Sequence, residues 1–284
     1  MVARQLQVFT ALRNRDFRIY WTGFQFHIMG YALTFFTIGW LAFHLTGSPL
    51  DLSFVTLDLA VTRSGLNVVG GAVADRLNPK HVLTVVQSIA SSVVAALAFL
   101  TLTEQVELWH LVVGSILLGI FLAFDHPSRT ALYPRLLSDS RELAKAVPLI
   151  IMAWDLNRII WPAAAGVIIH ALGAEVSFFM GAVGFVVMAS VVQLLRPRHV
   201  PRSNSSNMID SMAEGFRYIW SNRLFRVLVS TAYVNNFLGM SYVFLLPIFA
   251  KDVLQMDARG LGILASAAPI GGILAVLIMP NILR

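Results

Sequence analysis

Residues 14–18 read NRDFR, and residues 222–226 read NRLFR. Each copy of this short polar word stands directly before a long apolar run that is rich in aromatic residues. A word that recurs in a matching context favours an internal duplication over coincidence. The segments that follow the two copies therefore decide the fold.

The composition places the chain in a membrane. Hydrophobic residues make up 57% of it and charged residues 13%, whereas soluble proteins carry about 25% charged residues. A segment that crosses the hydrocarbon core must pair its own backbone polar groups, so it forms either a helix or part of a closed barrel. The apolar runs are too long and too uniform for barrel strands. The sequence thus predicts an all-α, polytopic membrane helix bundle.

Eight apolar runs predict the transmembrane helices, and a Pro-, Arg- and Ser-rich stretch at 196–210 separates the first six from the last two. This spacing predicts a six-helix bundle over residues 1–196 and the start of a second bundle over 223–284. Between them, residues 197–222 are expected to hold a cytoplasmic linker and a short interfacial helix, which the capping-box spacing of Ser211 and Glu214 indicates. The runs span residues 17–45, 52–74, 82–103, 108–132, 146–172, 176–195, 224–250 and 260–282.

The positive charges predict the orientation, because loops rich in Lys and Arg stay on the cytoplasmic side. With a cytoplasmic N-terminus, the outer loops hold only Lys251 and Arg259 of the 21 Lys and Arg residues, while Arg63 and Arg158 fall within predicted spans. We therefore expect the N-terminus in the cytoplasm. The basic loop ends are expected to contact the lipid bilayer rather than nucleic acid.

Both copies of the repeated word enter the membrane from the same side, which is typical of parallel internal repeats. This arrangement, together with GGAVADRLNPKHVL at 70–83, resembles the major facilitator superfamily of secondary transporters. The segments FLAFDHPSRTALYPRLL, NRIIWPAAAG, EGFRYIW and LLPIFAKDVL are similar to an enterobactin-exporter-like efflux subgroup. The resemblance covers essentially the whole chain and implies a multi-pass protein of a plasma membrane, here the bacterial inner membrane.

The family's loop motif is matched in part by Gly71, Asp75, Arg76 and Lys80. The resemblance implies that these residues form a cytoplasmic latch between the two halves of the transporter. Without the family, the same residues describe a tight turn in which Gly71 allows two helices to approach and the charges set the topology. Both interpretations stay open at this stage.

Parallel repeats of six helices require four more helices after residue 282. On the family resemblance, we expect the 284-residue chain to be a C-terminally truncated form of a transporter that is about 400 residues long.

Four charged residues fall inside the predicted spans, where each costs about 2.5–3.5 kcal/mol on insertion scales and so faces protein or a wet cavity. Asp155 and Arg158 share one helix face. They form either an internally neutralised pair that fixes packing or a site for a proton or substrate. Asp58 and Arg63 point to different neighbours, because they lie five residues apart.

Other candidate site residues come from position along the predicted helices. Asp125 and Arg129 lie near the cytoplasmic end of the fourth run and are interpreted as residues of a cytoplasmic gate or as topology-setting charges. His27 is interpreted as an interfacial or hydrogen-bonded filler rather than a proton relay. The stretch RIIWPAAAG resembles the fifth-helix motif of antiporters, with Trp161 in place of a glycine. By resemblance, the possible cavity lining comprises Gln25, Tyr31, Tyr233, Asn235 and Asn236.

These observations favour a proton-coupled exporter of small amphipathic molecules, such as drugs or siderophores. The alternative is a membrane scaffold or receptor-like protein that transports nothing. An intramembrane enzyme is disfavoured, because the sequence has no HExxH, no GxSxG and no His/Asp cluster on one helix face. The chain contains no cysteine, and we expect no metal and no cofactor.

Overall fold

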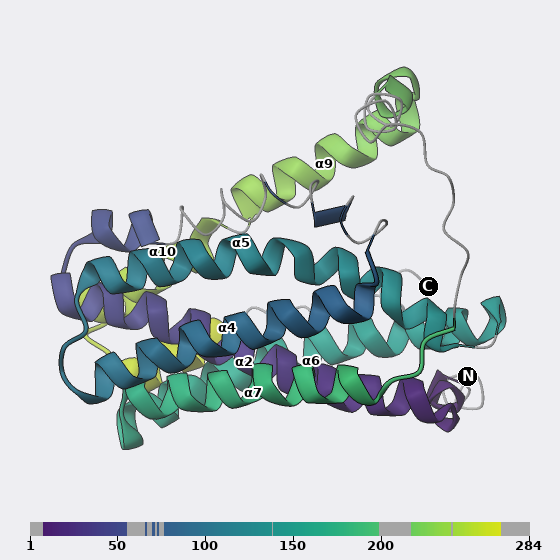
Figure 1. The fold of residues 1–284 in the computed structure, drawn as a ribbon. Coiled ribbons are helices and arrows are strands. Elements are labelled where there is room, and N and C mark those ends of the chain that lie inside the picture. The colour runs from purple at the N-terminus through teal and green to yellow at the C-terminus, as the bar shows by residue number, and fades with distance from the viewer. Residues whose placement is uncertain are drawn as a thin grey trace.

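The computed structural model describes residues 8–55, 66, 70, 71, 73, 77–137, 139–198, 217–239 and 241–267. Within these ranges the regular structure is helical, which confirms the predicted all-α bundle (Figure 1). The elements are η1 (Val8–Arg13), α2 (Arg15–Thr46), α4 (Pro79–Leu102), α5 (Leu108–Leu132), η2 (Tyr133–Leu136), α6 (Ser140–Leu172), α7 (Ala174–Leu194), α9 (Arg223–Gly239), α10 (Ser241–Ile248) and the π-helical turn η3 (Phe249–Val253). Residues 258–267 are also helical.

Four of the described helices are long and apolar enough to cross a membrane: α2, α4, α5 with its η2 extension, and α7. The 33-residue α6 is of similar length but contains Pro148 and Pro162. Most of the predicted run at 52–74, and the end of the run at 260–282, lie outside the described residues. The run at 224–250 is described as α9 and α10, with residue 240 between them outside the described residues, and it ends in η3, shortly after Pro247 removes a backbone donor.

Each copy of the repeated word begins a helix through its asparagine. The Asn14 side-chain oxygen accepts hydrogen bonds from the backbone N–H groups of Asp16 (3.1 Å) and Phe17 (3.2 Å). In the second copy, the Asn222 side chain accepts a bond from the N–H of Leu224 at 3.0 Å. Both are N-caps, which satisfy donors that the first turn of a helix leaves unpaired.

The first bundle is organised around α7, which packs against α2, α4 and α6, while α5 packs on α4. Helices α2 and α7 cross with their backbones in contact: a Cβ atom added at Gly184 would lie 2.9 Å from the Cα of Gly30. Small residues at a crossing permit this approach in a membrane, where tight packing replaces the hydrophobic effect.

The two ends of the bundle are defined by its connections. Asn14 donates to the carbonyl of Leu136, so α2 begins where α5 and η2 end; this is called the N-terminal end. Helices α9 and α10 run in the same sense as α2 (Figure 1). At the opposite, far end, the Lys251 ammonium lies 5.0 Å from the ring centroid of Phe43.

Candidate functional site

One stripe of α6 meets the helical residues 258–267 near the far end. A Cβ atom at Gly166 would lie 3.1 Å from the carbonyl carbon of Ala258. One at Gly262 would lie 3.1 Å from the Cα of Ala163. These glycines let two helices from different parts of the chain touch without intervening side chains.

Two polar contacts extend this interface in both directions. Ser266 donates a hydrogen bond from its hydroxyl to the carbonyl of Ile159 at 2.7 Å. At the far end, His170 Nδ1 lies 2.7 Å from the carboxylate of Asp257, and both side chains are about half exposed. The α6 stripe thus runs from His170 to Ile159 against the segment 257–266.

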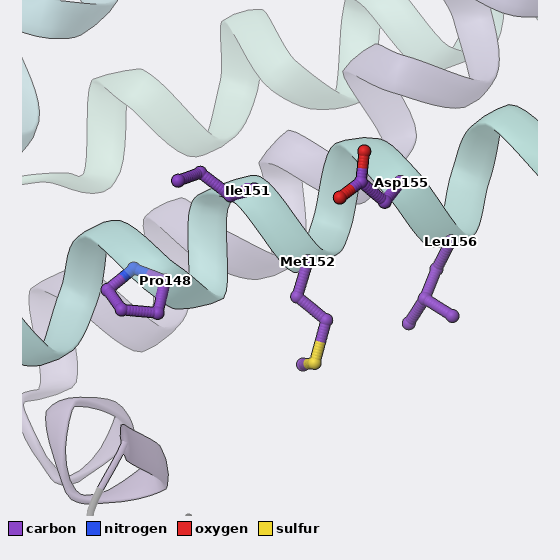
Figure 2. A pocket seen from close by; sticks show the side chains of 5 residues that line it. All are labelled: Pro148, Ile151, Met152, Asp155 and Leu156. Carbon is purple, nitrogen blue, oxygen red and sulfur yellow. The ribbon is translucent and has the colours of Figure 1, made fainter. Parts of the chain in front are cut away.

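Asp155 continues the same stripe toward the N-terminal end, one helical turn before Ile159. It lies at the middle of α6, which is about 50 Å long at 1.5 Å per residue. The side chain is exposed and lines a hollow of about 340 Å³ together with Pro148, Ile151, Met152 and Leu156 (Figure 2). A carboxylate at this depth is tolerated where it meets water or protein.

Arg158 is exposed as well, and no ion pair joins it to Asp155 within the described part of the chain. The structure therefore gives no support to a closed Asp155–Arg158 pair in this conformation. The other two predicted intramembrane charges, Asp58 and Arg63, lie outside the described residues.

Only part of the predicted loop-motif latch can be placed, because Asp75 and Arg76 lie outside the described residues. Lys80 donates from its ammonium to the carbonyls of Gln193 (2.9 Å) and Leu195 (2.8 Å), which are at the C-terminus of α7. A cation is favourable there, because the last carbonyls of a helix carry partial negative charge.

The close approach that was predicted at Gly71 occurs one residue earlier. A Cβ atom at Gly71 would meet nothing within 4 Å, whereas one at Gly70 would lie 3.2 Å from the Cα of Phe124 in α5. Helical geometry accounts for the correction, since neighbouring residues on a helix point about 100° apart and one of the two glycines faces α5.

The predicted cavity residues of α2 form polar and aromatic contacts with α6. The Gln25 carbonyl oxygen accepts a bond from the side-chain amide of Asn157 at 2.5 Å, and Asn157 accepts one from the indole N–H of Trp161 at 2.5 Å. The Tyr31 ring lies 6.0 Å from that of Trp154. Trp161 therefore anchors an amide chain at the position where the antiporter motif has glycine.

The predicted lining residues of the second bundle lie on α9. Tyr233 and Asn235 are exposed. Nothing about the side chain of Asn236 is described. The structure therefore brings the α2 residues together with α6, and it does not bring the α9 residues to them.

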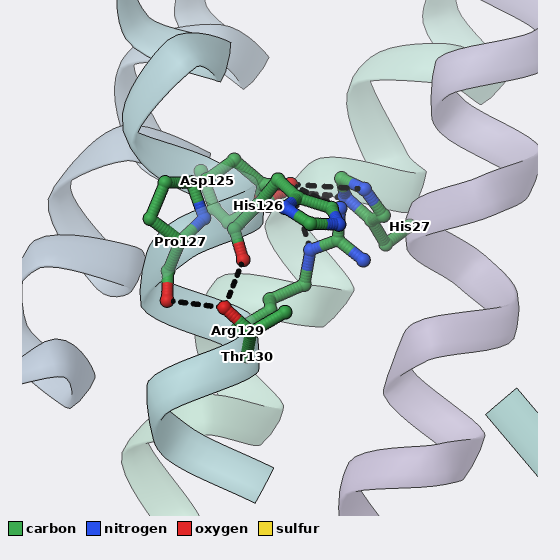
Figure 3. A network of polar contacts seen from close by, with 7 residues as sticks. His27, Asp125, His126, Pro127, Arg129 and Thr130 are labelled. Carbon is green, nitrogen blue, oxygen red and sulfur yellow. Dashed lines mark hydrogen bonds and ion pairs between the residues drawn. The ribbon is translucent and has the colours of Figure 1, made fainter. Parts of the chain in front are cut away.

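A buried polar cluster lies between α2, α4 and α5 (Figure 3). Arg129 donates to the Asp125 carboxylate from Nε at 2.7 Å and from a terminal nitrogen at 2.5 Å. The two side chains are 5% and 3% exposed. The pair was predicted as a gate at the helix end, but it faces the bundle interior, because its partners come from α2 and α4.

His27 and Gln87 complete the cluster; the sequence analysis interpreted His27 as a hydrogen-bonded filler, and it did not single out Gln87. The Gln87 amide nitrogen donates to Asp125 Oδ1 at 2.6 Å, and His27 Nε2 lies 3.5 Å from Asp125 Oδ2. His27 Nδ1 faces the Gln87 amide, with its nitrogen at 3.0 Å and its oxygen at 3.3 Å. The available signal was a strongly polar side chain within each of two apolar runs, one imidazole and one amide.

The Arg129 guanidinium is covered by aromatic rings, 5.0 Å from the centroid of Phe24 and 5.8 Å from that of Trp154. Such contacts stabilise a desolvated cation. Arg129 therefore connects the buried cluster to the α2–α6 aromatic region.

A family model described as "Transmembrane secretion effector" matches residues 6–284. The chain belongs to the transmembrane secretion effector family. This family is part of the major facilitator superfamily of transporters, so the match confirms the superfamily that the sequence motifs resemble.

Two curated transporters are similar to this chain. The staphyloferrin A transporter of Staphylococcus aureus (strain NCTC 8325 / PS 47) is 28% identical over 226 residues, which are 77% of this chain and 55% of the relative. The uncharacterized MFS-type transporter YfiS of Bacillus subtilis (strain 168) is 25% identical over 183 residues, 63% of this chain and 42% of the relative. The chain spans about half the length of these relatives.

Family membership also decides between the broad classes. Members of the family are transport proteins, so the prediction of a non-enzymatic membrane protein is confirmed. Within the described residues, no group of three or more metal-binding side chains converges.

Proposed function

We propose that this protein acts as a secondary active transporter that exports small amphipathic molecules by alternating access. The observation that carries the proposal is the α6 stripe. It touches the segment 257–266 at the far end and presents Asp155 in a hollow toward the N-terminal end. A face of α6 that is covered at the far end and uncovered around Asp155 supports a state in which a site opens to one side of the membrane, as alternating access requires.

The orientation rests on the charge distribution. With Lys and Arg concentrated at the N-terminal end, that end faces the cytoplasm of a bacterium and the far end faces outward. The contacts of His170 and Ser266 then close the outer side. This conformation would accept its substrate from the cytoplasm, which is the side from which an exporter loads.

The lining of the α2–α6 region supports an amphipathic substrate. Trp154, Trp161 and Tyr31 provide apolar surface, while Gln25 and Asn157 provide amide groups that bind hydroxyl or carboxyl groups. The similarity to a staphyloferrin A transporter supports the siderophore class among amphipathic molecules. Proton coupling is proposed to involve Asp155, which is the exposed carboxylate in the middle of α6.

Transport into inside-out vesicles tests the proposal. The amphipathic dye Hoechst 33342 is added outside vesicles from cells that express the chain, and a pH gradient, acidic inside, is imposed. We expect gradient-dependent accumulation that an Asp155→Asn variant loses while it inserts into the membrane normally. Normal gradient-dependent accumulation in that variant would contradict the coupling role of Asp155.

The alternative is a membrane scaffold or receptor-like protein that transports nothing. The same assay separates the two. A relative of about 400 residues serves as the positive control. If this chain gives no dye transport in vesicles where that relative does, the scaffold is favoured.

A further inference from the structure

The buried cluster of His27, Gln87, Asp125 and Arg129 has the chemistry of a proton-binding site. Its members come from three helices, α2, α4 and α5, and are at most 4% exposed. Buried ionisable groups are costly in a membrane bundle, and the Asp125–Arg129 pair alone would neutralise its own charge. Packing therefore does not require an imidazole beside this pair.

His27 is placed so that its two ring nitrogens have different partners. Nε2 faces the Asp125 carboxylate at 3.5 Å. Nδ1 faces the Gln87 amide. The Asp125 carboxylate favours a proton on Nε2 whether the imidazole is neutral or charged. The proton that is bound and released is therefore the one on Nδ1.

The Gln87 amide fits both states of Nδ1. Its nitrogen, at 3.0 Å, donates to the bare Nδ1 of a neutral imidazole. Its oxygen, at 3.3 Å, accepts from the N–H of an imidazolium. Because the two amide atoms are almost equally near, a small rotation of Gln87 exchanges donor for acceptor. Few side chains can serve both states without a change of backbone.

Two aromatic rings also contact His27. The Phe24 ring stacks on the imidazole at 6.0 Å, and the Phe185 ring of α7 meets it edge-on at 5.8 Å. From α4 the facing group is the neutral Gln87, and from α5 it is Asp125, with Arg129 on the other side of that carboxylate. The charged groups near His27 include Asp125 and, beyond it, Arg129.

We propose that His27, held between Asp125 and Gln87, is a site at which the protein takes up and releases a proton during transport. In the uptake step, a proton from water binds to Nδ1 of neutral His27, and the Gln87 amide oxygen accepts the new N–H. The Asp125 carboxylate then balances two cations, His27 and Arg129. Release to water reverses the step. The proposal rests on the transport function proposed above and adds a second ionisable site to Asp155.

The consequence for the cluster is a competition for one carboxylate. Asp125 Oδ2 is shared between Arg129 and His27, at 2.5 and 3.5 Å. A charge on His27 draws Asp125 toward α2 and weakens its hold on Arg129, which lies against Trp154 of α6. Protonation is thereby connected to the helix that bears the substrate-facing stripe.

The test observes the imidazole directly and does not depend on transport. The chain is labelled with carbon-13 histidine, placed in nanodiscs, and its histidine signals are followed by NMR from about pH 5 to about pH 8, the range in which histidine changes charge. A His27→Gln variant identifies the His27 signal. A His44→Gln variant, which removes an exposed histidine at the end of α2, is the matched control.

We expect the His27 signal to change between the neutral and charged forms within this range. In Asp125→Asn, the change should be absent or displaced by at least about one pH unit. Asp125→Glu keeps the negative charge and should retain the change of the His27 signal with pH. It is the second test of the carboxylate if Asp125→Asn does not fold. A His27 signal that stays in one form throughout, or a transition that is unchanged in Asp125→Asn, would overturn the proposal. Because no substrate is involved, this failure is distinct from a failure to transport the dye.

Discussion

His170 at the end of α6 and Asp257 before the helical residues 258–267 form an ion pair, with Nδ1 and Oδ2 2.7 Å apart. The pair joins two parts of the chain that belong to different predicted bundles. It lies at the outermost point of the α6 stripe. Whether the pair is formed or broken therefore indicates whether the far end is closed.

Trapping this contact should stop transport. The chain has no cysteine, so a His170→Cys/Asp257→Cys double variant places two thiols in a clean background. We expect a short bifunctional thiol reagent to link the two cysteines. To detect the link, the chain is cut at a protease site engineered between residues 199 and 210, and the two fragments stay together on a gel when they are linked. Linked protein should lose dye accumulation and each single variant should keep it; full transport by linked protein would show that the contact need not open.

The Asp125–Arg129 ion pair inside the first bundle should also contribute to stability. Removing one partner of a buried ion pair leaves an uncompensated charge and costs about 3–5 kcal/mol. We therefore expect Arg129→Gln to lower the thermal unfolding temperature in detergent strongly. A double Asp125→Asn/Arg129→Gln variant should be less destabilised than the sum of the two single variants. Additive losses would mean that the two residues act independently.

Two glycines offer a matched comparison of packing. Adding a methyl group at Gly184 brings a carbon to 2.9 Å from the Gly30 backbone, whereas at Gly71 it meets nothing within 4 Å. Gly184→Ala should destabilise the protein by about 1–3 kcal/mol, the typical cost of overpacking. Gly71→Ala should leave the unfolding temperature almost unchanged. Equal effects of the two variants would place the helix crossing elsewhere.

The orientation can be checked with single cysteines at opposite ends of the bundle. Ser48→Cys lies just after α2 and Arg196→Cys just after α7. In intact cells, we expect a membrane-impermeant maleimide to label the cysteine at 48 and to label the one at 196 only after the cells are opened. The reverse pattern would invert the proposed direction of the pathway.

Much of the fold could be predicted, because apolar runs and capping residues are local signals. The repeated word predicted two helix starts, and Asn14 and Asn222 are N-caps. The bounds of α5 agree with the predicted run at 108–132. The π-helical turn η3 at the end of the run at 224–250 was missed, since apolarity alone does not reveal a change in helix type.

The site was harder to predict, because its partners are far apart in sequence. The Asp125–Arg129 pair is local, with a spacing of one helical turn, and both residues were singled out. His27 and Gln87 reach the same carboxylate from other helices, and a single sequence does not state which helix faces meet. For the same reason the sequence showed that Asp155 is a membrane-embedded charge but not that it shares a stripe with Ile159 and His170.

The contact between Gly30 and Gly184 has a mechanical consequence. Where two backbones touch, no side chains lie between them that could rearrange. We therefore expect α2 and α7 to move together as one rigid unit. Any rocking of the first bundle must then be absorbed at its rim, where α6 meets the second bundle through glycines, one hydroxyl and one ion pair. A small molecule that binds at this rim would therefore block the movement without occupying the substrate site.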